Sequence, residues 1–182
     1  MEEIEEELDY EVIDNFLPQK EFQEIQATIM GESGKSIGWV YNTSITHENK
    51  ETTWKHFYMT HMVCQSSVIT SPLICKSILP VLEKIDAKAL IRIKINLFPN
   101  SEKIHENKMH ADMSFSHRGA LFSINTCDGY TKLKDGTKID SVANRMLLFD
   151  AGMPHCSTNT SDTAARFNIQ IKDSDIKYIF NQ

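Results

Sequence analysis

The sequence predicts a mainly β domain with flanking helices, an α+β arrangement in which an antiparallel sandwich or barrel follows N-terminal helices. Apolar residues recur at helical spacing in the first half of the chain, and from residue 90 the period changes to two, as in half-buried strands. Turn residues separate the strand candidates. A chain of 182 residues without an internal repeat or linker is long enough for one domain, residues 1–182.

Residues 1–9 form an acidic lead-in, and residues 10–89 are expected to supply helices and a loop that pack on the sheet. The stretch YEVIDNFLP begins with a short strand, and Pro18 is placed to open a helix in its first turn. Apolar residues then recur at helical spacing until Gly31, where the helix is expected to end. These apolar residues are Phe22, Ile25 and Ile29.

The polar, turn-rich segment 34–50 predicts a loop over the core. Trp39 and Tyr41 inside it are either a substrate lid or an aromatic satellite of the core. The aromatic stretch WKHFYMTHMV predicts a strand, and SPLICKSILPVLEKID predicts a helix that Pro80 kinks or splits. The apolar face of that helix carries Ile74, Ile78, Leu82 and Ile85.

Residues 90–175 are expected to form the β core. In LIRIKINLF, apolar and polar residues alternate, which predicts a half-buried strand. We expect Arg92 and Lys94 on the exposed face of an edge-like strand, and the mouth of an active site is the alternative. The Asp-Gly pair at 135–136 predicts a hairpin, and the pair at 128–129 a second turn. Further strand candidates are ALFSINT, GYTKLK, TKIDSV, RMLLFD and ARFNIQIK.

The composition argues against several classes of protein. A formal net charge of −6 disfavours binding of nucleic acid through non-specific phosphate contacts, with a local basic groove as the remaining alternative. No stretch approaches the roughly 18–20 apolar residues that span a bilayer, and the acidic N-terminus differs from a signal peptide. We therefore expect a cytoplasmic protein without membrane contact. The cysteines show no CxxC spacing and are expected to be free thiols: Cys64, Cys75, Cys127 and Cys156.

One cluster of residue types indicates metal chemistry. His110-Ala111-Asp112 follows the first long strand candidate, and an extended chain directs this imidazole and carboxylate the same way. His155 follows the strand RMLLFD and the turn AGMP. Two histidines and one carboxylate on one side of an ion leave the opposite positions open, which suits non-haem ferrous iron. Zinc or another cupin-type metal would accept the same ligands.

Arg166 is a candidate for holding an anion beside this metal. It follows His155 by eleven residues, across the turn-rich STNTSDTA, so the two are expected to flank one hairpin. On the returning strand Arg166, Asn168 and Gln170 share a face. A planar guanidinium can bind a carboxylate through two parallel hydrogen bonds. Together these residues indicate a metal that binds a small dicarboxylate.

The other histidines have competing interpretations. The HxD pair alone is as typical of a polar surface loop as of a metal site. The presence of His155 and Arg166 at matching positions in the sequence favours the interpretation as metal ligands. His105 and His117 are rival ligands because both lie close to the pair, although the charge of Arg118 disfavours a cation beside His117. The remaining histidines are expected to be surface or packing residues: His47, His56 and His61.

Most of the chain resembles the iron(II)- and 2-oxoglutarate-dependent oxygenases, in particular the short prolyl-4-hydroxylase-like members of bacteria and phages. The resemblance rests on YEVIDNFLP, IRIKINLFP, MHADMS and the segment INTCDGYTKLKDGTKIDSVANRMLLFDAGMPHCSTNTSDTAARFNIQIK, and it is densest from Ile91 to Lys172. HxD, a histidine after an NR-apolar-FD strand, and an arginine eleven residues later form a more specific set than HxD alone.

This resemblance implies a double-stranded β-helix (jelly-roll) core that carries Fe(II) on His110, Asp112 and His155. It implies 2-oxoglutarate as cosubstrate, chelating the metal at one end and held by Arg166 at the other, with O2 as oxidant and ascorbate as a candidate reductant. Hydroxylation of a C–H bond then accompanies release of succinate and CO2. Asp112 stands where halogenating relatives carry a small residue, which favours hydroxylation.

The resemblance extends less firmly to two asparagines and to the substrate. Asn125 matches a strand position that faces the cosubstrate in relatives, with a plain strand hydrogen bond as the alternative. Asn168 departs from the family pattern, in which a small hydroxyl residue is common. A peptidyl, prolyl-like or amino-acid substrate is expected by analogy. The alternatives are a cupin-like metal-binding jelly roll with a non-oxidative activity or a binding role, and a degenerate interaction module.

Overall fold

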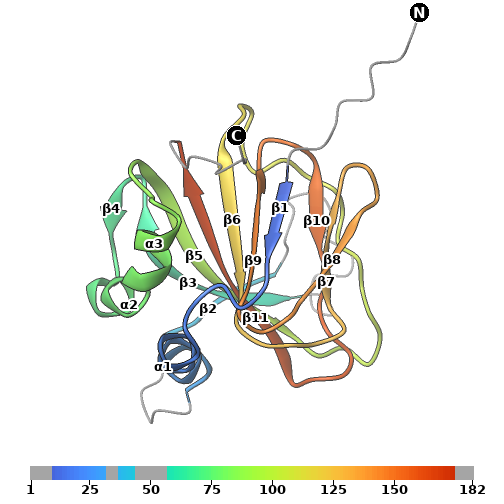
Figure 1. The fold of residues 1–182 in the computed structure, drawn as a ribbon. Helices are drawn as coiled ribbons and strands as arrows, with labels where there is room; N and C mark the ends of the chain where they lie inside the picture. Colours follow the sequence, from blue (N-terminus) through green and yellow to red (C-terminus); the bar gives the residue numbers. More distant parts are fainter. Residues whose placement is uncertain (1–9, 32–36, 44–56, 175–182) are drawn as a thin grey trace, which may run out of the picture.

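A computed structural model describes residues 10–31, 37–43 and 57–174, and these form two antiparallel β-sheets with three helices (Figure 1). The helices lie on one side of the large sheet, and the small sheet lies on the other. This arrangement confirms the prediction of a mainly β jelly-roll core with N-terminal helices.

The large sheet has the strand order β1-β9-β6-β11-β5-β3-β2, and β4 pairs with β3. Its strands pair antiparallel, and the longest strands, β5 and β11, lie side by side near its middle. Its strands are β1 (Tyr10–Ile13), β2 (Val40–Asn42), β3 (Tyr58–Gln65), β4 (Val68–Ile69), β5 (Leu90–Pro99), β6 (Arg118–Ser123), β9 (Arg145–Asp150) and β11 (Ala165–Asp173).

The small sheet has the order β10-β7-β8, with β7 (Tyr130–Leu133), β8 (Lys138–Asp140) and β10 (His155–Ser157). The predicted hairpin at residues 135–136 joins β7 to β8, and Gly136 has the positive φ of 92° that such a turn requires. Because β7 also pairs with β10, this hairpin supports the strand that carries His155.

The helices form where the apolar spacing predicts them. Helix α1 (Gln19–Met30) begins after Pro18 and ends at Gly31, whose φ of 82° allows the left-handed C-cap. Its inward face carries the three predicted apolar residues. The second predicted helix is split into α2 (Pro72–Ser77) and α3 (Leu79–Lys84), with the break just before Pro80.

The large sheet has two chemically different faces because its central strands alternate. Ile93 and Ile95 of β5 and Ile169 and Ile171 of β11 are fully buried on the face that the helices cover. Full burial of each such side chain contributes about 1.5–3 kcal/mol, and a slip of one residue would exchange the two faces. The polar side chains between them therefore point to the opposite face, toward the small sheet.

Two details differ from the sequence-based expectations. Strand β5 lies between β11 and β3, so it is internal and the expectation of an edge-like strand is wrong. Part of the expected loop 34–50 forms β2, and Trp39 packs against the core with its ring 6.0 Å from that of Phe167. Residues 34–36 and 44–50 of that segment, with His47 and His56, lie outside the described residues.

Two short strands, β4 and β10, of two and three residues, were not predicted from the sequence. Within the part of the chain that the structure describes, no helix has the length and apolar character needed to cross a membrane.

Candidate metal centre

His110 and His155 lie side by side because their backbones form an antiparallel bridge. The amide of each residue donates to the carbonyl of the other, at 2.9 Å in both directions. A hydrogen-bonded pair of this kind directs both side chains to the same face. The two imidazole rings accordingly lie 5.0 Å apart between centroids, although 45 positions separate them in the sequence.

The protonation of both imidazoles suits metal binding. Nδ1 of His155 lies 2.9 Å from the carbonyl oxygen of Met153, and Nδ1 of His110 lies 3.2 Å from that of Lys108. A carbonyl oxygen only accepts, so each Nδ1 carries the proton and each Nε2 keeps its lone pair. Burial, followed by the neighbouring His155, lowers the pKa of His110 and favours this neutral form.

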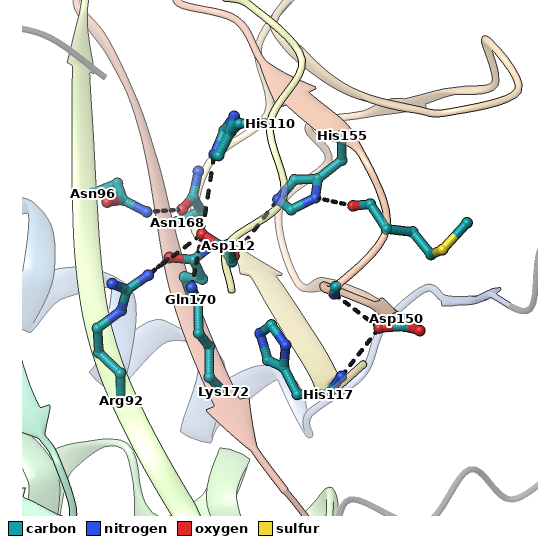
Figure 2. Close-up of polar contacts among 12 residues, drawn as sticks. Arg92, Asn96, His110, Asp112, His117, Asp150, His155, Asn168, Gln170 and Lys172 are labelled. Carbon is teal, nitrogen blue, oxygen red and sulfur yellow. Dashed lines mark hydrogen bonds and ion pairs between the residues drawn. The ribbon is translucent and has the colours of Figure 1, made fainter. Parts of the chain in front are cut away.

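Asp112 completes the centre and lies between the two rings and a set of donors (Figure 2). One oxygen is 3.6 Å from Nε2 of His155, and the ligand atoms of all three residues lie within 4.8 Å of one another. Lys172 Nζ contacts the carboxylate at 2.7 Å and Gln170 donates to it at 2.8 Å. Burial acts to raise the pKa of Asp112, but the charge and hydrogen bonding of the Lys172 ammonium outweigh it and hold the pKa well below its usual range.

A cavity of about 310 Å³ opens at this centre, between the two sheets. Its polar side includes Arg92 and Lys94 of β5, so their placement on an exposed face is wrong and the alternative, the mouth of the site, is what the structure shows. Asp112 is the sole acid among the lining residues of the described chain. The lining is Tyr58, Arg92, Lys94, Asn96, Phe98, His110, Ala111, Asp112, Leu121, Thr131, Phe149, His155, Ser157, Asn168 and Gln170.

Arg166 is not one of the lining residues; it is 1 % exposed and reaches the cavity wall through a contact with Thr131. Its Nη1 donates to the carbonyls of Tyr130 and Thr158, and its Nη2 donates to Oγ1 of Thr131, a residue of the cavity wall. These bonds use three of the five N–H groups, and the buried Nε has no hydrogen-bond partner. Burial lowers the pKa of Arg166 to about 10, so the side chain stays cationic at neutral pH.

The two asparagines have different surroundings. Asn125 does not line the cavity; its amide donates to the carbonyl of Ala165 and accepts from the amide of Phe167. These bonds connect Asn125 to the backbone on both sides of Arg166, at the start of β11. Asn168 lines the cavity and accepts a hydrogen bond of 2.8 Å from Asn96.

The rival histidines do not join the cluster. Among the described residues, the group able to hold a metal ion consists of His110, Asp112 and His155. His117 is buried, and its Nδ1 lies 3.0 Å from the carbonyl of Phe115. His61 bridges Gly38 and Ser71 on the other side of the sheet, as a packing residue would.

Lys172, the closest partner of Asp112, is not among the site residues predicted from the sequence. The signal was present, because the alternation that places Arg166, Asn168 and Gln170 on one face of β11 continues to Lys172. Lysine is rarely fully buried, so its position near the end of a strand indicated a solvated residue. The structure shows it 0 % exposed and paired with the carboxylate.

Comparison of the sequence with protein-family models and with curated proteins finds no match. Solved structures share the fold. A Trichoplax adhaerens prolyl hydroxylase in complex with a hypoxia inducible factor peptide matches with a TM-score of 0.64 at 18 % identity, over 91 % of this chain and 83 % of that one. A Pseudomonas putida prolyl-4-hydroxylase matches with a TM-score of 0.55 at 12 % identity, over 93 % and 94 % of the chains.

A third similar structure is the epimerase SnoN in complex with Fe3+, alpha ketoglutarate and nogalamycin RO. Its TM-score is 0.64 at 10 % identity, over 92 % of this chain and 79 % of that one. At these identities the comparisons establish a shared fold, the jelly roll of iron- and 2-oxoglutarate-dependent oxygenases.

Proposed function

We propose that this protein is an iron(II)- and 2-oxoglutarate-dependent dioxygenase that hydroxylates a C–H bond. The observation that carries the proposal is the pair of imidazoles with protonated Nδ1 and free Nε2, converging with Asp112 on one point beside a cavity. The shared fold with enzymes of this class supports the same conclusion. When bound there, ferrous iron with 2-oxoglutarate and O2 supplies the oxidation, with release of succinate and CO2.

The donor set fits ferrous iron. Two neutral imidazole nitrogens and one carboxylate oxygen on one side of an ion leave room for a chelating cosubstrate and O2. Gln170 and Lys172 fix the carboxylate before any metal arrives, which lowers the entropic cost of assembling the site. Phe98, Leu121 and Phe149 give the cavity apolar walls that limit the access of water.

Arg166 is proposed to hold the far carboxylate of 2-oxoglutarate. Its Nε and one further N–H are not used by the protein, and a charge-assisted pair of hydrogen bonds to a carboxylate satisfies both. Thr131 accepts a hydrogen bond from Arg166, so its own O–H is available to donate to the same carboxylate. Asn125 enters this proposal as the residue that keeps Arg166 in position.

The proposal is tested by anaerobic addition of 2-oxoglutarate to protein loaded with ferrous iron. We expect a visible charge-transfer band in the wild type, and succinate release once O2 is admitted. His110→Ala and Asp112→Ala each remove a ligand and are expected to abolish both signals. Absence of the band from folded, iron-loaded wild type would refute the proposal and favour a metal-binding jelly roll without oxidative activity.

A further inference from the structure

Two cations, Arg92 and Lys94, line one wall of the cavity, and a third, Lys172, lies buried behind Asp112. None of the three is proposed to ligate iron or to bind 2-oxoglutarate. Arg92 pairs in register with Lys172, and Lys94 pairs with Gln170, on the cavity face of β5 and β11. We call Arg92, Lys94 and Lys172 the cationic wall. Lys172 lies six residues beyond Arg166, so their Cα atoms are separated by roughly 20 Å along the strand.

The cationic wall has too few counter-charges within the described structure. Asp112 is the one acid among the cavity-lining residues, and it is shared by Lys172 at 2.7 Å and Arg92 at 3.4 Å. Nε of Arg92 is buried without a hydrogen-bond partner. The ammonium of Lys94 lies 5.6 Å from the centre of the Tyr58 ring. This cation–π contact stabilises the ammonium less than a paired anion would.

The excess of positive charge at the cavity persists when iron and 2-oxoglutarate bind, and this step of the inference rests on the proposed function. The charges of Asp112, a divalent iron, a dicarboxylate and Arg166 cancel one another, so no acid among the described lining residues remains to compensate the cationic wall. Cations in a partly enclosed cavity are costly unless they are paired. Burial and the nearby charge of Arg92 already lower the pKa of Lys94 to about 8.

We propose that the primary substrate is a small acid whose carboxylate or phosphate group binds to Lys94 and Arg92. Lys172, which is fully buried behind Asp112, adds to the positive potential without reaching the substrate. A cavity of about 310 Å³ lies at the lower end of the usual range for ligand sites and also has to hold the cosubstrate, which favours a small molecule. A neutral prolyl side chain leaves the cationic wall unpaired.

The test compares charged probes with neutral counterparts by calorimetry, on anaerobic protein loaded with ferrous iron and 2-oxoglutarate. The pairs are L-aspartate with L-asparagine, L-glutamate with L-glutamine, and O-phospho-L-serine with L-serine. We expect at least one charged member to bind about tenfold or more tightly than its counterpart, because hydrogen bonds to charged groups are the stronger ones. The best pair shows whether the substrate group is a carboxylate or a phosphate.

In the Lys94→Met and Arg92→Gln variants, the ratio of the affinity for the charged probe to the affinity for its neutral counterpart is expected to fall toward one. Lys76→Met, which removes the same charge from an exposed position on α2, is expected to keep it. Three results would overturn the inference: no charged member binds better than its counterpart, N-acetyl-prolinamide binds better than every acid, or Lys94→Met loses affinity for 2-oxoglutarate instead. Failure of the charge-transfer band to form would count against the proposed function, whereas the probe titrations report on the cationic wall alone.

Discussion

The position of one proton on each imidazole decides which nitrogen is available to a metal ion. Backbone carbonyls two residues upstream fix that proton on Nδ1 in both His110 and His155. The sequence identifies both histidines but does not show these bonds, which depend on the local backbone path. At the residue scale the metal centre is therefore prepared by main-chain acceptors as much as by the ligands themselves.

Arg166→Met tests the proposed anchor of the cosubstrate. Loss of two charge-assisted hydrogen bonds is expected to weaken 2-oxoglutarate binding by about 100-fold, while ferrous binding persists. Anaerobic titration of the charge-transfer band gives the dissociation constant, and circular dichroism verifies the fold. Arg145→Met is the matched control, because Arg145 pairs with Asp14 outside the cavity. An unchanged dissociation constant in folded Arg166→Met would place the anchor elsewhere.

Lys94 is expected to make binding of an acidic probe depend on pH. Burial lowers its pKa to about 8, so the ammonium is present below that pH and is lost above it. The groups that face it are Arg92, Asp112, Lys172 and the Tyr58 ring. Affinity for the best acidic probe should therefore fall as the pH rises from 7 to 9. An arginine at this position keeps its charge over this pH range, so Lys94→Arg should remove most of the decrease in affinity. An equal decrease in the variant would mean that a group other than Lys94 causes the pH dependence.

At the scale of elements, strand β11 connects the parts of the site. Because successive side chains alternate, the polar residues of β11 lie on the cavity face and the apolar residues pack toward the helices. The polar residues are Arg166, Asn168, Gln170 and Lys172, and the apolar residues are Phe167, Ile169 and Ile171. The period of two was readable from the sequence, so the residues that share this face were predictable. The neighbours of β11 were not, because a strand's own period does not specify which strands pair with it.

The turn before β7 is expected to control the position of Arg166. A Cβ atom at Gly129 would lie 2.8 Å from Cδ of Arg166 and would also meet the backbone oxygen of Asn159. Gly129→Ala should displace the guanidinium, weaken 2-oxoglutarate binding about tenfold and cost about 1–3 kcal/mol of stability. Titration and thermal unfolding measure the two effects.

Gly38→Ala provides the comparison for that variant, since a Cβ atom at Gly38 meets nothing within 4 Å. It should leave the affinity for 2-oxoglutarate unchanged. If Gly129→Ala also bound 2-oxoglutarate normally, Arg166 would not be the group that the turn constrains.

At the scale of the whole molecule, the metal centre joins segments from distant parts of the chain, so metal binding should stabilise the entire fold. Manganous ion at one hundred times its dissociation constant is expected to add about 2.7 kcal/mol. For a chain of this size the midpoint of thermal unfolding rises by roughly 5–10 °C. Differential scanning calorimetry measures the shift.

Asp112→Asn should abolish most of that rise, because the charged ligand is lost. Asp86→Asn changes an exposed acid outside the cavity and should preserve it. A rise of the same size in both variants would mean that the ion stabilises the protein from a different site.

Local patterns in the sequence predict the periodicities, the helix ends at Pro18 and Gly31, the hairpin at residues 135–136 and the residue types of the candidate metal centre. These features depend on local conformational preferences, which a short stretch of chain expresses by itself. The internal position of β5 and the orientation of Arg92 and Lys94 toward the cavity become visible in the three-dimensional fold alone. The physical reason is that the partner of a strand, and hence the surroundings of its polar face, is set by long-range pairing and by burial of the opposite face.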